Sequence, residues 1–153
     1  MKKILSIALL TLGLFFFAAG AANAQTVSGA IGTVARGGSV KGTVTLSIPG
    51  GLHVNSNRPN SQYAIPTSVR ISAVGAKTSA VSYPRGRNRK FQFSEDTLNV
   101  YEGTVSFSFN LTVPASFKGS VVRVRAVVRY QACTDEVCYP PNTKEVTLTA
   151  RVK

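Results

Sequence analysis

The chain has few of the side chains on which hydrolytic or group-transfer chemistry depends. Its 153 residues include one histidine, six acidic residues and no tryptophan. The acids are scattered or lie at predicted loop tips, and no glycine-rich phosphate loop is present. No set of nucleophile, base and orienting group can therefore be assembled. These absences argue against a hydrolase or a transferase.

Ligands for metals and cofactors are equally scarce. The only two cysteines, Cys133 and Cys138, have a Cys-x4-Cys spacing that is not typical of zinc sites, and the only histidine is His53. The single methionine is the initiator, which argues against copper, and there is no Cys-x-x-Cys-His haem motif. Metal binding is the least favoured use of the cysteines, and we expect no cofactor.

Long hydrophobic runs are also scarce, and the one that is present lies at the N-terminus. Two lysines precede an apolar run over residues 4–19, and "AANA" then precedes Gln25. This order is typical of a secretory signal peptide over residues 1–24, cleaved near Ala24. An uncleaved membrane anchor is the alternative. We expect export to the periplasm or beyond, where disulfides persist.

Positive charge, in contrast, is abundant: 18 lysines and arginines give the chain a formal net charge of +12. Loss of Lys2 and Lys3 with the signal peptide would leave +10 on residues 25–153, a length that suits one domain. The densest cluster, "RGRNRK" at residues 85–90, is interpreted as a solvated loop. No nucleic-acid-binding module accompanies it, so we expect no nucleic acid as partner. A membrane surface or an acidic partner is the alternative for this cluster.

Apolar and polar residues alternate along most of the chain after residue 25. The segments "VKGTVTLSI", "YEGTVSFSFNLTV", "VRVRAVVRY" and "EVTLTARV" all show this period of two, which is typical of strands with one buried face. Prolines and glycines separate them as turns, and no amphipathic helix is apparent. We predict an all-β fold with seven to nine strands, an immunoglobulin-like two-sheet sandwich over residues 25–153. It lacks the tryptophan and the distant cysteine pair of antibody domains.

Both cysteines lie in one short segment, "YQACTDEVCYPP" at residues 130–141. If the preceding strand continues to Ala132, alternation places Cys133 on the outer face, towards solvent or a covering loop. Residues 134–137 then form a loop tip, and a disulfide would close the mouth of a hairpin. A disulfide that closes such a short loop adds only about 2 kcal/mol to the stability of the protein. A rigid dithiol with one sulfur within reach of another thiolate suits thiol-disulfide exchange. A structural clip and a redox pair both remain open on spacing alone.

The segment "VVRYQACTDEVCYPP", followed by "TKEVTL", resembles the redox segment of the N-terminal domains of the thiol:disulfide interchange protein DsbD family. "GLHVNSNRP" and "SYPRGRNRKFQFSEDTLNVYEGTV" also resemble segments of that family. The resemblance implies an immunoglobulin-like periplasmic domain whose two cysteines cycle between dithiol and disulfide. It implies a thioredoxin-like electron donor fed by a membrane-embedded transporter, and periplasmic oxidoreductases as acceptors.

The same resemblance implies roles for individual residues. Cys138 would be the sulfur attacked in mixed disulfides, and Cys133 would resolve them. The family shields its cysteines with a cap loop carrying an aromatic, for which "FQFSEDTL" nominates Phe93 or, second, Phe91; ordinary core packing is the alternative for both. Other candidates line or flank the site: His53, Tyr139 and Gln131. Asp135 and Glu136 would either raise the thiol pKa or simply solvate the loop tip.

One departure from the family concerns length. DsbD proteins continue into a membrane domain and a thioredoxin-like domain, whereas this sequence ends at Lys153. We therefore expect either a stand-alone protein that exchanges electrons with separate partner proteins, or a domain that has lost this electron relay. A second hypothesis of another class is a non-catalytic envelope β-sandwich that binds a partner and carries a structural disulfide.

Overall fold

The computed structural model describes residues 25–153, so the predicted signal peptide lies outside the described residues. The described part contains eleven strands and no helix, which confirms the all-β prediction. It accordingly has no helix long and apolar enough to cross a membrane. The strands are β1 (Thr26–Ile31), β2 (Ser39–Ser47), β3 (His53–Asn55), β4 (Ser68–Ala73), β5 (Lys77–Thr78), β6 (Arg87–Lys90), β7 (Thr97–Tyr101), β8 (Thr104–Thr112), β9 (Val121–Tyr130), β10 (Ala132–Cys133) and β11 (Asn142–Arg151).

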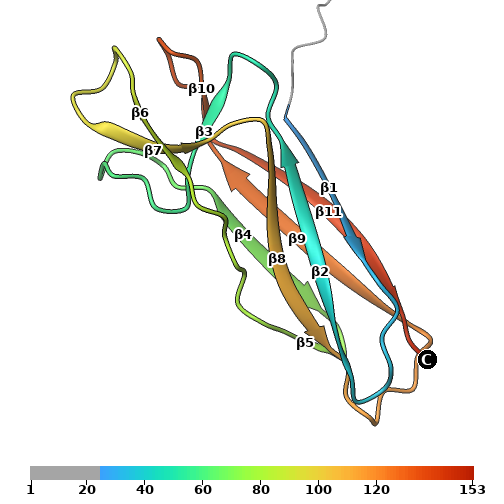
Figure 1. Cartoon of the computed structure of the whole chain (residues 1–153). Coiled ribbons are helices and arrows are strands. Elements are labelled where there is room, and N and C mark those ends of the chain that lie inside the picture. Colours follow the sequence, from blue (N-terminus) through green and yellow to red (C-terminus); the bar gives the residue numbers. More distant parts are fainter. Residues whose placement is uncertain (1–24) are drawn as a thin grey trace, which may run out of the picture.

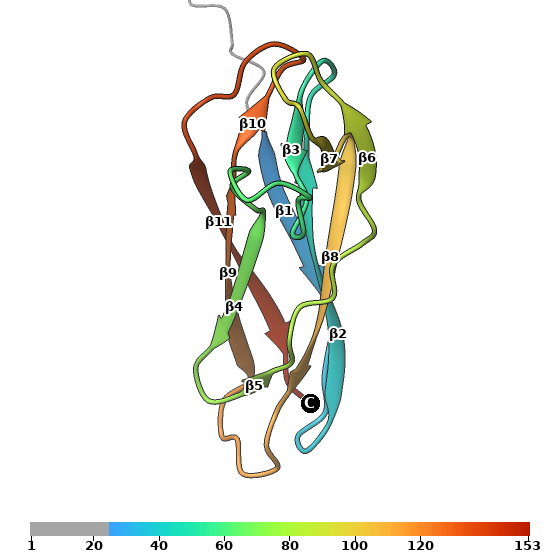
Figure 2. The same cartoon turned by 90° about the vertical axis from the view of Figure 1, so that its left-hand side faces the viewer.

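The strands form two sheets that are built mainly of long strands, called the large sheets, and one sheet of short strands, called the small sheet. The large sheets have the orders β1-β2-β8-β5 and β11-β9-β4, and they face each other along the length of the molecule (Figures 1 and 2). The small sheet, β10-β3-β7-β6, lies at one end of the sandwich (Figure 1). All the pairings in these sheets are antiparallel.

The core between the large sheets follows the alternation seen in the sequence. In β8, every second residue from Val105 to Leu111 is buried, while the residues between them are half-buried or exposed. In β9, every second residue from Val122 to Tyr130 is buried in the same way. Because successive side chains of a strand point to opposite faces, each sheet contributes one apolar face to a shared core.

Gly42 shows how closely the core is packed within one sheet. It is paired with Phe109 across β2 and β8, and the aromatic ring lies over the glycine. A Cβ at position 42 would stand 2.3 Å from Cζ of Phe109, which is far inside van der Waals contact. The apolar face of β2 therefore needs glycine at this position, between Val40 and Val44.

Three expectations about strands need correction. The number of strands is eleven rather than seven to nine, because β3, β5 and β10 are only two or three residues long and show no alternation. The basic segment is not a loop throughout, because Arg87–Lys90 forms edge strand β6 paired with β7. All four of its side chains are exposed. Charged side chains are common on edge strands, where they discourage further pairing.

The third correction concerns the strand before Cys133, which was expected to run without interruption to Ala132. The long strand β9 ends at Tyr130, and after Gln131 the chain leaves that sheet to pair with β3 as β10. Ala132 and Cys133 are both buried as a result. Tyr130 and Ala132 pack in the main core and Cys133 does not, so the predicted alternation holds, and Cys133 is buried on the other side rather than exposed.

Candidate functional site

The two cysteines form a disulfide across the base of a short hairpin. Cys133 and Cys138 are bonded, with their Cα atoms 4.0 Å apart. The Tyr139 amide donates to the Ala132 carbonyl at 2.9 Å, and the Thr134 amide donates to the Val137 carbonyl at 2.8 Å. These backbone bonds hold the chain on either side of the disulfide in one antiparallel register.

The tip of this hairpin is organised by Thr134. Its hydroxyl accepts hydrogen bonds from the amides of Glu136 and Val137, at 3.2 and 3.0 Å. A side-chain oxygen that binds backbone amides two and three residues ahead stabilises a tight turn. The side chains of Asp135 and Glu136 are exposed. The predicted hairpin with a loop tip at residues 134–137 is therefore present.

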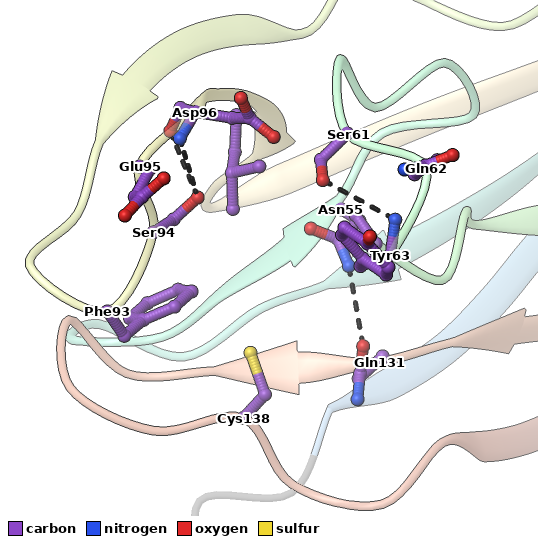
Figure 3. Close-up of a pocket in the computed structure, with 12 residues that line it drawn as sticks. Asn55, Ser61, Gln62, Tyr63, Phe93, Ser94, Glu95, Asp96, Gln131 and Cys138 are labelled. Carbon is purple, nitrogen blue, oxygen red and sulfur yellow. Dashed lines mark hydrogen bonds between the residues drawn. The ribbon is translucent and has the colours of Figure 1, made fainter.

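The two sulfurs differ in their surroundings. Cys133 is fully buried, with no exposed surface, and it is paired with His53 across β10 and β3. Cys138 is half-buried and lines an open groove of about 620 Å³ between the loops at residues 61–64 and 93–96. Figure 3 shows its sulfur pointing towards this groove. Of the two sulfurs, only Cys138 lines a groove through which an attacking thiolate could approach.

Three aromatic rings are stacked beside the disulfide. The ring of His53 lies 4.0 Å from that of Phe91, and Phe91 lies 5.3 Å from Phe93, each measured between centroids. Phe91 is only 4% exposed and packs in a small apolar cluster with Leu98 and Val100. Phe93 is 39% exposed and lines the same groove as Cys138 (Figure 3). Of the two nominated cap residues, Phe91 thus occupies a core position and Phe93 a surface position.

His53 is buried in a largely apolar setting. Its side chain is 2% exposed, and within residues 25–153 its Nε2 atom has no hydrogen-bond partner. Burial lowers the pKa of His53 below its usual 6.5, although the nearby charges of Asp135 and Glu102 oppose the shift. Desolvation disfavours the charged imidazolium, so His53 is neutral at pH 7.

This burial predicts a specific pH dependence of stability. Because the folded-state pKa of His53 lies below 6.5, the unfolded chain binds this proton more readily than the folded protein does. The stability of the protein therefore falls as the pH decreases through about 6.5, and it levels off below the folded-state pKa. Urea unfolding across this range measures the effect.

His53→Phe is the matched control, because it keeps a ring in the stack and removes the titrating group. Since His53 is the only histidine, the variant should lose most of the pH dependence between about pH 7.5 and about 5. If the free energy of unfolding depends on pH equally in the wild type and in His53→Phe, the buried imidazole does not control stability in this pH range.

The structure brings the remaining candidates to the same end of the molecule. Gln131 lines the groove and donates from Nε2 to the Tyr139 carbonyl at 3.1 Å. Tyr139 is 47% exposed and lines a second groove on the other side of the hairpin. All seven candidate residues therefore lie on or beside β3, β10 and the loop before β7.

One further groove residue, Asn55, was not singled out from the sequence. It is 2% exposed, donates to the Ile65 carbonyl at 3.1 Å and makes a longer contact of 3.5 Å with Gln131 (Figure 3). Its Oδ1 atom has no hydrogen-bond partner among the described residues. Nothing in the sequence marks Asn55, because β3 has only three residues and its burial depends on distant segments. In residues 25–153, no three His, Cys, Asp or Glu residues are grouped so as to hold a metal ion.

Comparisons with known proteins agree with this architecture. The family model described as "Thiol:disulfide interchange protein DsbD, N-terminal" matches residues 23–150. The crystal structure of the N-terminal periplasmic domain of ScsB from Proteus mirabilis matches with a TM-score of 0.56 and 13% identity. That match covers 83% of this chain but only 46% of the other, and it shows a shared fold.

A second solved structure is the DsbD N-terminal domain of Neisseria meningitidis in the reduced form. It matches with a TM-score of 0.49 and 18% identity, over 82% of this chain and 86% of that chain. A comparison with curated proteins finds no match.

Proposed function

Because this chain belongs to the family of N-terminal domains of the thiol:disulfide interchange protein DsbD, we propose that it is an exported thiol-disulfide exchange protein. The observation that carries the proposal is the disulfide itself. One sulfur, on Cys138, lines an open groove, and the other, on Cys133, is buried behind it. A purely structural clip would need no such difference in access.

The exchange balances as two successive displacements. A donor thiolate attacks Sγ of Cys138, the bond between the two cysteines breaks, and Cys133 leaves as a thiolate. A second thiolate of the donor then attacks the donor sulfur that is bonded to Cys138. The donor thereby forms its own disulfide, and Cys138 is released as a thiolate. Two electrons have reached this protein, and two protons from solvent complete the dithiol. The reverse sequence reduces an acceptor disulfide, with Cys138 attacking and Cys133 resolving.

We propose a thioredoxin-like protein or domain as the donor and periplasmic disulfide oxidoreductases as acceptors, with a membrane electron transporter upstream. Support comes from the surface around the cysteines. Of the six large hydrophobic side chains that are exposed in residues 25–153, four lie at this end: Tyr63, Phe93, Val137 and Tyr139. Exposed apolar groups that surround a reactive sulfur are typical of a docking surface.

An exchange assay tests the proposal. The oxidised protein is mixed with a reduced thioredoxin-like protein, and the loss of its disulfide is followed by thiol labelling and mass measurement. We expect both cysteines to become reduced together within the time of the assay. A disulfide that persists in the folded protein and is reduced only after unfolding would identify a structural clip in a non-catalytic sandwich.

A second prediction concerns shielding by Phe93. Phe93→Ala should speed the attack of a small reductant on the disulfide several-fold, because the ring lines the groove that leads to Cys138. The reduction potential should change little, since shielding alters access to the sulfur more than the redox equilibrium. Stopped-flow reduction by dithiothreitol measures the rate. Tyr63→Ala, on the opposite wall of the groove, is the control, and equal rates for wild type and Phe93→Ala would remove Phe93 from the cap.

A further inference from the structure

The two large sheets have outer faces of different character. The strands β4, β9 and β11 carry five exposed arginines: Arg70, Arg123, Arg125, Arg129 and Arg151. The outer face of the β1-β2-β8-β5 sheet is made mainly of serine and threonine, and the only charged residues in those four strands are Lys41 and Lys77. Positive charge is therefore concentrated on one of two otherwise similar faces, which we call the arginine face.

The strand register spreads these arginines over three neighbouring strands. On β9, Arg125 is paired with Ser72 of β4 on one side and Thr147 of β11 on the other. Arg129 is flanked in the same way, by Ser68 and Thr143. Same-face residues of one strand lie about 7 Å apart, and neighbouring strands about 4.8 Å apart. Long guanidinium groups thus stand among short hydroxyl side chains on the outer face of this sheet.

Little negative charge compensates the arginine face. Its one carboxylate, Glu145, forms a two-point ion pair with Arg125, with N–O distances of 2.6 and 2.5 Å. In the part of the chain that the structure describes, no carboxylate lies within ion-pair distance of the other four arginines. The face therefore keeps about four uncompensated positive charges, from Arg70, Arg123, Arg129 and Arg151.

The other five acids of the chain lie elsewhere. Glu95 and Asp96 belong to the loop that lines the groove, and Asp135 and Glu136 to the hairpin tip. Glu102 follows β7 and is paired with Arg89. At the redox end these acids are balanced by the basic residues in and before β6, whereas the arginine face is mainly basic. Such a charge distribution orients the molecule in an electric field.

We propose that the arginine face docks the protein onto a membrane surface that carries anionic phospholipids. A bilayer surface presents many phosphates at once, which matches several guanidinium groups spread over three neighbouring strands, each able to bind phosphate by two hydrogen bonds. An acidic protein would match the charge as well, and the test below includes it as an outcome.

Co-sedimentation with vesicles tests this proposal. The protein, purified in its exported form, is mixed with vesicles of phosphatidylcholine alone or of phosphatidylcholine with phosphatidylglycerol. We expect binding that depends on phosphatidylglycerol and weakens with added salt. The triple variant Arg70→Ser/Arg123→Ser/Arg129→Ser should lower the partition coefficient by about 100-fold, which is roughly fivefold for each arginine. Its exchange with a soluble thioredoxin-like protein should be unchanged.

Two controls carry the same change in net charge. Lys41→Ser/Lys77→Ser/Lys118→Ser removes three exposed lysines outside the arginine face, and Arg58→Ser/Arg85→Ser/Arg87→Ser removes three exposed arginines in or near the basic cluster at residues 85–90. Each should lower vesicle binding by only a few-fold, with circular dichroism confirming the fold of every variant. Equal losses in all three variants would overturn the proposal, because net charge alone would then explain binding. The absence of any phosphatidylglycerol-dependent binding, or capture by an acidic protein instead, would overturn it as well.

Discussion

The Cys133→Ala variant is expected to form a stable covalent complex with a thioredoxin-like partner that lacks its own resolving cysteine and whose remaining cysteine is activated as a mixed disulfide with an aromatic thiol, which is the leaving group. The Cys138→Ala variant should form little or none. The reason is access: Cys138 lines the open groove, whereas Cys133 is fully buried and paired with His53 in the small sheet. Non-reducing electrophoresis and mass spectrometry of the complex measure the difference.

The control for this experiment is the unfolded state. In urea both remaining thiols are exposed, so the two variants should react with the partner's activated disulfide to a similar extent. A difference that exists only in the folded proteins would then be due to the burial of Cys133. If the folded variants form equal amounts of complex, the assignment of Cys138 as the attacked sulfur is wrong.

The second large effect is expected on stability. Phe91→Ala should lower the free energy of unfolding by about 3 kcal/mol or more, because it removes a buried ring from the cluster with Leu98 and Val100 and leaves a cavity. It also removes the ring that stacks on His53 at 4.0 Å. Denaturant unfolding of the oxidised protein measures this loss.

Phe93→Ala is the matched control, since it removes the same side chain two residues further along. Because Phe93 is 39% exposed, its loss should change stability by no more than about 1 kcal/mol. The two variants together distinguish a residue that packs in the core, Phe91, from a residue that shields the disulfide, Phe93. Equal losses of stability would contradict the core position of Phe91.

The large sheets could be predicted from sequence because their burial depends on a local property. Alternation in β2, β8, β9 and β11 places every second residue in the shared core, whatever the order of the strands. The short strands could not be found in this way. β5 and β10 have two residues each, and only their partners, β8 and β3, define them as strands.

The site shows the same division between local and non-local information. The spacing of Cys133 and Cys138 predicted a closed hairpin, which depends only on adjacent residues. The burial of Cys133 depends on the switch from β9 to the small sheet after Gln131, and nothing in the alternating pattern marks that switch. The stack of His53 on Phe91 joins segments 38 residues apart in sequence, so it could not be read from either segment alone.

The reduction potential of the Cys133–Cys138 pair tests the proposed function most directly. The folded protein is equilibrated with glutathione or thioredoxin buffers of known potential, and the oxidised fraction is measured by thiol labelling. An exchange protein should give a value between about −120 and about −270 mV, the range of known dithiol oxidoreductases. A value below about −300 mV, typical of structural disulfides, would contradict the account and leave a β-sandwich with a clip.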